Sequence, residues 1–138
     1  MSSIGSPKAL CTIHGKMHMR IMLVEDNTTF RKTFKEGLSG LCPFATLDEA
    51  ANGDEALQKI NSSPPQMVFM DFRLPGENGL RLIQRIKAQF PNIRIAMVTS
   101  YDFAEYRQAA VQSGAERYFV KGSFSWDDVK EFVKCHSA

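Results

Sequence analysis

RIMLVED, at residues 20–26, is an apolar run that ends in two acidic residues, Glu25 and Asp26. A second apolar run, at residues 67–70, is followed in the same way by Asp71. A continuous apolar run fits a strand that is covered on both faces, as in a parallel sheet. Helix-like sequence separates the two runs, so we predict that they are parallel strands of an α/β sheet.

Two later runs also end in polar residues. The run from Ile93 to Val98 is followed by Thr99, and the run Tyr118 to Val120 is followed by Lys121. Open α/β sheets bind ligands at the carboxyl ends of their strands. We therefore expect carboxylates, a hydroxyl and an ammonium to meet at one edge of the sheet.

The sequence between these runs predicts helices, and a weaker strand is expected from Phe44 to Ala50. Five βα units without an internal linker predict a parallel sheet with helices on both faces and right-handed crossovers. Periodicity leaves the strand order open. The last two helices are expected from about Asp102 to Ser113, stopped at Gly114, and after Lys121. For four of the five helices the spacing also predicts an inner face. These faces are, in chain order, Phe30, Phe34, Leu38 and Leu41; Ala56, Leu57 and Ile60; Leu80, Ile83, Ile86 and Phe90; and Trp126, Val129, Phe132 and Val133.

Composition indicates one ordinary globular domain. The chain has 138 residues, of which 43% are hydrophobic and 23% charged, and its net charge is +2. This balance implies neither nucleic acid nor an anionic membrane as an electrostatic partner. No window resembles a transmembrane span or a secretory signal. The three cysteines are widely spaced, which favours reduced thiols in a cytoplasmic protein.

Residues 1–18 are expected to be a flexible leader or a remnant of cloning, and residues 19–138 the folded domain. The leader contains Cys11, His14 and His18. A structural zinc site needs four ligands, and no fourth is near in the sequence, so a disordered tail is the favoured interpretation.

Five motifs stand in order at the ends of alternate elements: LVEDN at 23–27, ANGDEAL at 51–57, VFMDFRLPGENG at 68–79, MVTS at 97–100 and GAERYFVK at 114–121. Over about residues 19–136 the chain resembles the receiver domain of two-component response regulators. The resemblance implies a flavodoxin-like (βα)5 sheet in the order 2-1-3-4-5. The chain departs from the family pattern at Gly122, where many members have proline. In this respect it resembles the LuxR-type branch, and we expect the loop that carries Lys121 to be more mobile.

The resemblance also implies roles for single residues. Asp71 would be the phosphoacceptor. Asp26 would bind Mg²⁺ directly and Glu25 mainly through water, with Asp71 and the backbone carbonyl of Arg73 as further ligands. Glu25 replaces the commoner aspartate, a change that should preserve metal binding. Thr99 and Lys121 would contact the phosphoryl group, and Tyr118 would be the switching aromatic.

The chemistry requires these residue types. A carboxylate can attack a phosphoryl donor and form an acyl phosphate, while Mg²⁺ and an ammonium neutralise the charge on the transferred group. Mg²⁺ prefers oxygen ligands and keeps several waters, so two or three protein oxygens suffice. Each residue also has a structural interpretation: Asp71 as a turn former, Thr99 as a strand end, Lys121 as a surface charge and Tyr118 as core.

The function that the resemblance implies is a phosphorylation-dependent signalling switch. A histidine kinase or phosphotransfer protein would donate the phosphoryl group. The fourth helix, fifth strand and fifth helix, with Tyr106, Tyr118 and Trp126, would respond and contact an output domain, a partner protein or a second copy. Such a protein would assist its own phosphorylation and slow dephosphorylation but would not be an enzyme. We expect this chain itself to bind neither nucleic acid nor a membrane.

Three alternatives come from other classes. A binding module that works without phosphorylation would typically have lost an acid or the lysine. An aspartate-nucleophile phosphohydrolase would need a second aspartate where Arg73 stands. A flavodoxin is disfavoured because its first loop must hold phosphate, and Glu25 and Asp26 make this loop anionic.

Overall fold

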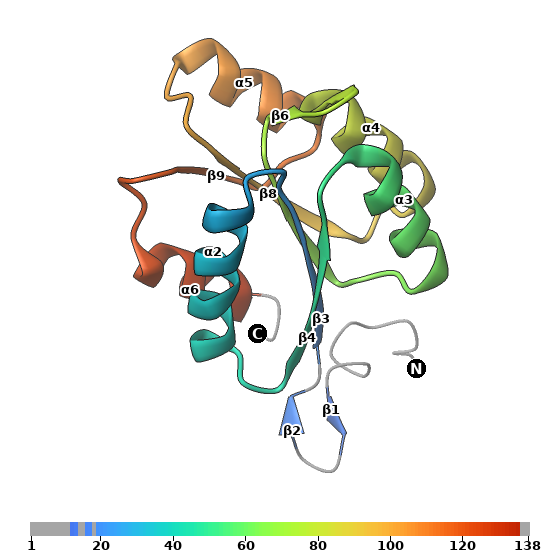
Figure 1. The fold of residues 1–138 in the computed structure, drawn as a ribbon, viewed down its shortest axis with the longest axis vertical. Helices are drawn as coiled ribbons and strands as arrows, with labels where there is room; N and C mark the ends of the chain where they lie inside the picture. The colour runs from blue at the N-terminus through green and yellow to red at the C-terminus, as the bar shows by residue number, and fades with distance from the viewer. Residues whose placement is uncertain (1–11, 14–15, 18, 136–138) are drawn as a thin grey trace.

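A five-stranded parallel sheet forms the centre of the computed structural model, which describes residues 12–13, 16–17 and 19–135 (Figure 1). Its strands are β3 (Met19–Val24), β4 (Ala45–Ala50), β5 (Met67–Met70), β8 (Arg94–Thr99) and β9 (Arg117–Val120). They lie in the order β4-β3-β5-β8-β9, and all four pairings are parallel. Counted along the chain this order is 2-1-3-4-5, which confirms the predicted flavodoxin-like fold.

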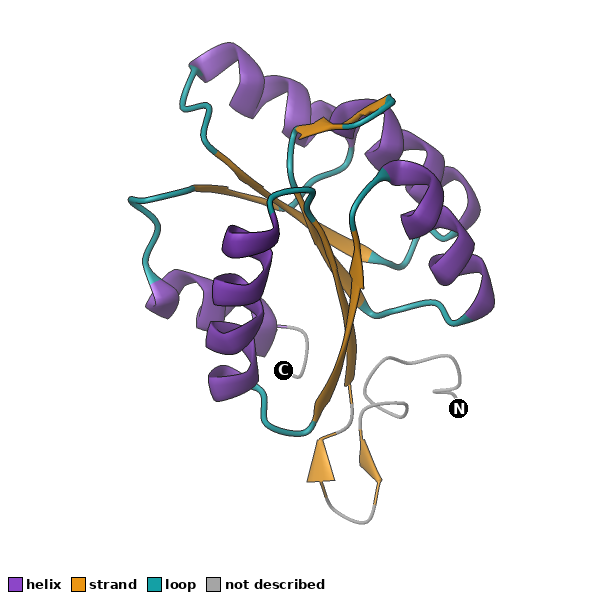
Figure 2. Ribbon diagram, viewed as in Figure 1, coloured by secondary structure: helices purple, strands orange, loops and turns teal. Residues whose placement is uncertain are grey.

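Helices cover both faces of the sheet, as Figure 2 shows. On one face lie α2 (Thr28–Leu41) and α6 (Trp126–Cys135), and on the other α3 (Gly53–Ser62), α4 (Gly79–Gln89) and α5 (Ala104–Ser113). The helix α5, predicted from about Asp102, starts two residues later, at Ala104. It ends as predicted before Gly114, whose φ is 121°.

The core consists of two apolar layers, one on each side of the sheet. Successive side chains of a strand point to opposite faces, so Ile21 and Leu23 pack towards α2 and α6, whereas Met22 and Val24 pack towards α3 and α4. Every residue of the predicted inner faces belongs to these layers or packs against them. The prediction missed Leu82, which is fully buried because it lies on the same side of α4 as Ile83 and Ile86.

Asparagines start three of the helices. The side chains of Asn27, Asn52 and Asn78 accept hydrogen bonds from the backbone amides of Phe30, Glu55 and Leu80. Such caps satisfy amides that have no partner inside the helix. They fix where each helix leaves the loop that precedes it.

A close helix contact explains one glycine in α2. A Cβ on Gly37 would lie 2.3 Å from the ring of Trp126, so the absence of a side chain lets α6 pack tightly on α2. The helix continues through Gly37 and Gly40 to Leu41.

Two short hairpins flank the main fold. The turn at Pro75–Gly76 joins β6 (Arg73–Leu74) to β7 (Glu77–Asn78), and Gly76 has a φ of 74°. Near the N-terminus, β1 (Thr12–Ile13) pairs antiparallel with β2 (Lys16–Met17). Cys11, His14 and His18 lie outside the described residues, so the leader remains a prediction. Within the part of the chain that is described, no helix is long and apolar enough to cross a membrane.

Candidate functional site

The site lies at the carboxyl ends of the three central strands and β9. The backbone amide of Asp71 donates to the carbonyl of Val24 at 3.1 Å, and that of Lys121 donates to the carbonyl of Thr99 at 2.8 Å. These bonds continue the strand pairing one residue beyond the strands. They bring the residue that follows each strand to the same edge of the sheet.

Lys121 bridges two carboxylates at this edge. Its Nζ lies 2.8 Å from Glu25 Oε1 and 3.1 Å from Asp71 Oδ2. The Glu25 side chain is only 2% exposed, so this ion pair is largely shielded from water. The ammonium also lies 4.4 Å from the centre of the Phe30 ring, a cation–π contact that holds it from the side of α2.

Three acidic residues form a cluster around the lysine. Carboxylate oxygens of Glu25, Asp26 and Asp71 lie within 4.8 Å of one another; Glu25 and Asp71 are buried and Asp26 is exposed. With Lys121 the group has an excess of negative charge, which a divalent cation would balance. An all-oxygen donor set fits a hard cation such as Mg²⁺, and an exposed Asp26 leaves room for retained water.

Backbone amides orient the two buried carboxylates. Phe72 N–H donates to Asp71 Oδ1 at 2.7 Å, and Asn27 N–H donates to Glu25 Oε2 at 2.9 Å. Each carboxylate thus has one oxygen on an amide and the other on Lys121. This arrangement restricts the rotation of both side chains.

Burial and pairing shift two pKa values. Burial of the Glu25 carboxyl raises its pKa, although the hydrogen bonds from Lys121 and Asn27 act in the opposite direction. Burial lowers the pKa of Lys121, but the hydrogen bonds and charges of Glu25 and Asp71 outweigh this effect, so the pKa is raised. Lys121 is therefore a cation at neutral pH.

Tyr101 contacts both Thr99 and Tyr118 through its backbone. The side chain of Thr99 is fully buried, and its Oγ1 lies 3.5 Å from the amide nitrogen of Tyr101. The half-buried Tyr118 donates its hydroxyl to the carbonyl of Tyr101 at 2.5 Å, and burial raises its pKa. Arg73 donates a hydrogen bond to the Tyr101 hydroxyl.

Gly79 supports the backbone that carries Asp71. A Cβ at this position would lie 2.5 Å from the Asp71 carbonyl oxygen and 2.8 Å from that of Phe72. The Gly79 amide donates to the Phe72 carbonyl at 2.8 Å. The start of α4 therefore packs directly under the loop after β5.

The sequence profile of the response regulator receiver domain matches residues 21–134. The chain belongs to the response regulator receiver domain family. Response regulators are components of two-component systems, and their receiver domains bind Mg²⁺ through acidic residues. The receiver domain here has such an acidic cluster at the edge of its sheet.

Curated relatives of this receiver domain include regulators that it matches over only about half of their length. Oxygen regulatory protein NreC of Staphylococcus carnosus is 33% identical over 76% of this chain and 49% of its own length. The uncharacterized transcriptional regulatory protein YhcZ of Bacillus subtilis is 33% identical over 84% of this chain and 52% of its own. The chain therefore spans about half the length of these relatives. Sporulation initiation phosphotransferase F of Bacillus subtilis is 30% identical over 86% of this chain and 93% of its own length.

Solved structures agree with this assignment. The receiver domain of NtrX from Brucella abortus has a TM-score of 0.76 and 28% identity over 85% of this chain and 97% of its own. A LuxR-family response regulator from Aurantimonas sp. has a TM-score of 0.77 and 27% identity over 86% and 84%. Together with NreC, such neighbours support the LuxR-type branch. Gly122 has a φ of 86°, which a proline could not adopt.

The structure brings together most of the residues that the sequence singled out. Glu25, Asp26, Asp71 and Lys121 form one cluster, and Thr99, at the end of β8, accepts the backbone hydrogen bond of Lys121. Tyr118 faces the neighbouring loop rather than the carboxylates, and the side chain of Arg73 is exposed.

Sequence reasoning missed several contributors to the site, namely the amide of Asn27, the ring of Phe30, Gly79 and Tyr101. Phe30 was assigned only to the core because its helical spacing fits an inner face. The position of Tyr101 two residues after Thr99, at the predicted edge, was a usable signal.

Proposed function

We propose that this receiver domain is a phosphorylation-dependent switch that accepts a phosphoryl group on Asp71. The observation that supports the proposal best is the double contact of Lys121 with Asp71 and Glu25. Through this contact a cation lies beside Asp71, the carboxylate that would attack the phosphoryl donor. The donor would be a phosphohistidine of a histidine kinase or of a phosphotransfer protein.

The reaction forms one bond and breaks another. A carboxylate oxygen of Asp71 attacks the phosphorus, the phosphorus–nitrogen bond of the donor breaks, and the freed imidazole keeps the electron pair and takes up a proton. The product is an acyl phosphate. Lys121 stabilises the negative charge of the phosphoryl oxygens, and the Thr99 hydroxyl is expected to donate to one of them.

Glu25, Asp26 and Asp71 would hold Mg²⁺ together with the backbone carbonyl of Arg73. The bound ion would supply positive charge for the transferred oxygens. Without a cation the negatively charged carboxylates repel one another. Lys121 offsets part of this repulsion, and the amides of Asn27 and Phe72 keep two of the carboxylates in place.

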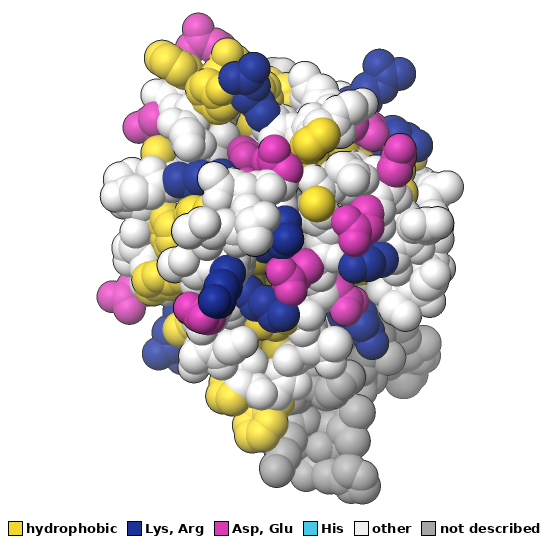
Figure 3. Space-filling model, viewed as in Figure 1, with side chains coloured by type: hydrophobic (Ala, Val, Ile, Leu, Met, Phe, Trp, Pro, Cys, Tyr) yellow, Lys and Arg dark blue, Asp and Glu magenta, His cyan; other side chains and the backbone are white. Residues whose placement is uncertain are grey.

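Phosphorylation is proposed to change the surface formed by α5, β9 and α6. Tyr118 on β9 and Thr99 on β8 both contact Tyr101. A movement of the Thr99 side chain towards a phosphoryl group would therefore be transmitted through Tyr101 to this surface. Hydrophobic side chains gather over the start of α5 in Figure 3, where Phe103 is 55% exposed. An output domain, a cytoplasmic partner protein or a second copy would bind there.

The test is phosphorylation with acetyl phosphate and Mg²⁺, followed by intact mass. The wild type should gain one phosphoryl group that hydroxylamine removes, as expected of an acyl phosphate. Asp71→Asn should gain none, because an amide cannot form this product. Lys121→Ala should retain some labelling, since the lysine stabilises charge but is not attacked.

Two outcomes would reject the proposal. Labelling of Asp71→Asn at the wild-type level would place the nucleophile elsewhere. A wild type that is labelled by neither small donors nor a cognate kinase would favour a binding module that works without phosphorylation.

A further inference from the structure

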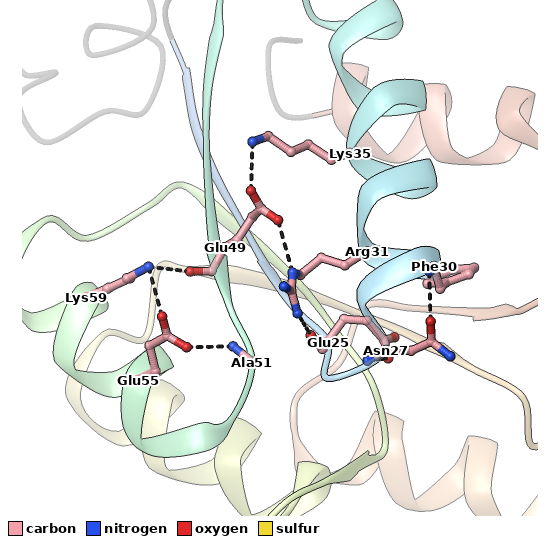
Figure 4. A network of polar contacts seen from close by, with 9 residues as sticks. All are labelled: Glu25, Asn27, Phe30, Arg31, Lys35, Glu49, Ala51, Glu55 and Lys59. Carbon is pink, nitrogen blue, oxygen red and sulfur yellow. Dashed lines mark hydrogen bonds and ion pairs between the residues drawn. The ribbon is translucent and has the colours of Figure 1, made fainter.

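Arg31 joins the acidic loop to the edge strand of the sheet, as Figure 4 shows. It lies in the first turn of α2, and its Nη1 donates to the backbone carbonyl of Glu25 at 2.5 Å. Its Nε donates to Glu49 Oε1 on β4 at 3.0 Å. The Arg31 side chain is 19% exposed. A single shielded guanidinium therefore spans from β4 to the peptide between Glu25 and Asp26.

That peptide determines where both carboxylates point. A peptide unit is planar, so the Glu25 carbonyl and the nitrogen and Cα of Asp26 move as one body. On its other side Glu25 is held by its own amide, which donates to the Ala50 carbonyl at 2.9 Å. The chain leaves the sheet at this point, since β3 ends at Val24 and α2 begins at Thr28. The bond from Arg31 thus acts at the point where β3 gives way to the loop.

The guanidinium is itself anchored. Glu49 receives Arg31 on one oxygen, and on the other it receives Lys35 Nζ at 2.7 Å. Both basic residues come from α2, so the edge strand and the helix hold the fork of Arg31 in one orientation. A planar fork can donate in two fixed directions, whereas a lysine ammonium is a compact point charge on a flexible chain.

We propose that Arg31 is a positioning residue for the Mg²⁺ ligands, holding the Glu25–Asp26 peptide so that the two carboxylates face Asp71. The proposal rests on the proposed function for its metal. Residues that orient metal ligands without touching the metal typically change metal affinity by about 10–100-fold when they are replaced. No feature of the sequence motifs assigned this role to Arg31.

Charge and positioning predict opposite effects, which makes the proposal testable. If Arg31 acted only as a nearby cation, its removal would strengthen Mg²⁺ binding. If it positions the ligands, Arg31→Gln should weaken Mg²⁺ binding by about tenfold. Arg31→Lys should also weaken it, because the charge stays but the two-directional fork is lost. Calorimetric titration of the purified chain with MgCl₂ measures this.

Lys35→Gln is the matched control. It removes a cation of α2 from the same glutamate but leaves the bond from Arg31 to the Glu25 carbonyl. Its Mg²⁺ affinity should stay within about twofold of the wild type, as a partly exposed charge predicts. An equal loss in both variants would overturn the proposal, because Lys35→Gln keeps the bond from Arg31 to the Glu25 carbonyl and would nevertheless bind Mg²⁺ as weakly.

Amide hydrogen exchange in the metal-free protein is the second readout. The amides of Asp26 and Asn27 should exchange faster in Arg31→Gln than in Lys35→Gln, after correction for the free energy of unfolding of each variant. If Arg31→Gln does not fold, Arg31→Lys carries both measurements. Unchanged or tighter Mg²⁺ binding in a folded Arg31 variant would overturn the proposal. If the wild type bound no Mg²⁺, the proposed function would fail, while exchange would still decide whether Arg31 holds this peptide.

Discussion

Gly79 lies so close to Asp71 that a Cβ on Gly79 would stand 2.5 Å from the Asp71 carbonyl oxygen. Gly79→Ala should therefore push the loop after β5 away from α4. We expect a loss of about 1–3 kcal/mol in the free energy of unfolding, the usual range for overpacking. Labelling of Asp71 by acetyl phosphate should also slow, because the carboxylate moves relative to Lys121. Urea unfolding and intact mass measure the two effects.

Gly40→Ala is the control for that substitution. Gly40 also lies in a helix, but apart from its own stretch of helix backbone no atom lies within 4 Å of the position of its Cβ. Alanine should raise the free energy of unfolding by roughly 0.5–1 kcal/mol, because glycine loses more conformational freedom on folding. A similar gain in both variants would show that helix propensity, rather than the close contact with Asp71, determines the effect at position 79.

Asp26→Ala should weaken Mg²⁺ binding by at least about tenfold, or roughly 1.4 kcal/mol, because a carboxylate ligand and its charge are removed together. Calorimetric titration checks this. Asp54→Ala removes an exposed acid at the start of α3, outside the acidic cluster, and should leave the affinity nearly unchanged. Equal affinity in Asp26→Ala and the wild type would refute the metal assignment.

Glu49 should make stability depend on acid pH. The hydrogen bond from Lys35, together with that from Arg31, lowers the pKa of Glu49 below its ordinary value of 4.5. A lowered folded-state pKa means that the stabilisation is fully present above the unfolded-state pKa and is lost as the pH falls through the folded-state pKa. Glu49→Gln should therefore cost roughly 0.5–1 kcal/mol at neutral pH, the range for partly exposed ion pairs, and nothing in strong acid.

Urea unfolding of the wild type and Glu49→Gln across the acid range tests this pH dependence. Glu36→Gln, which removes an exposed acid from α2, serves as the control. A stability difference between wild type and Glu49→Gln that stays constant with pH would contradict the assignment to this ion pair.

Beryllofluoride, which mimics a bound phosphoryl group, should change amide exchange in α5, β9 and α6. Thr99 and Tyr118 both contact Tyr101, so they connect the site with this surface. Tyr118→Phe removes the hydroxyl that donates to Tyr101 and should reduce the response. Changes confined to the surface of α2 and α3 would reject this route of coupling.

The edge of the sheet could be predicted because its signals are local. Each central strand is a short apolar run, and Glu25, Asp71 and Lys121 directly follow such runs. The carboxyl ends of parallel strands meet at one edge, so chemically complementary residues at those ends point to a shared site. The residues that support the site could not be found in this way. Gly79 matters only because α4 packs under β5, and Arg31 only because β4 lies beside β3.

The amino-acid sequence by itself determined the α/β alternation, the two-sided burial of the strands and the residue types at the end of each strand. These follow from hydrophobic periodicity and from chain direction, which act over a few residues. Only the tertiary structure decided which oxygen meets which donor. Lys121 and Asp71 are 50 residues apart, and their contact at 3.1 Å depends on the register of β5, β8 and β9. Register and helix packing arise from the simultaneous fit of the whole core, which no single stretch of sequence contains.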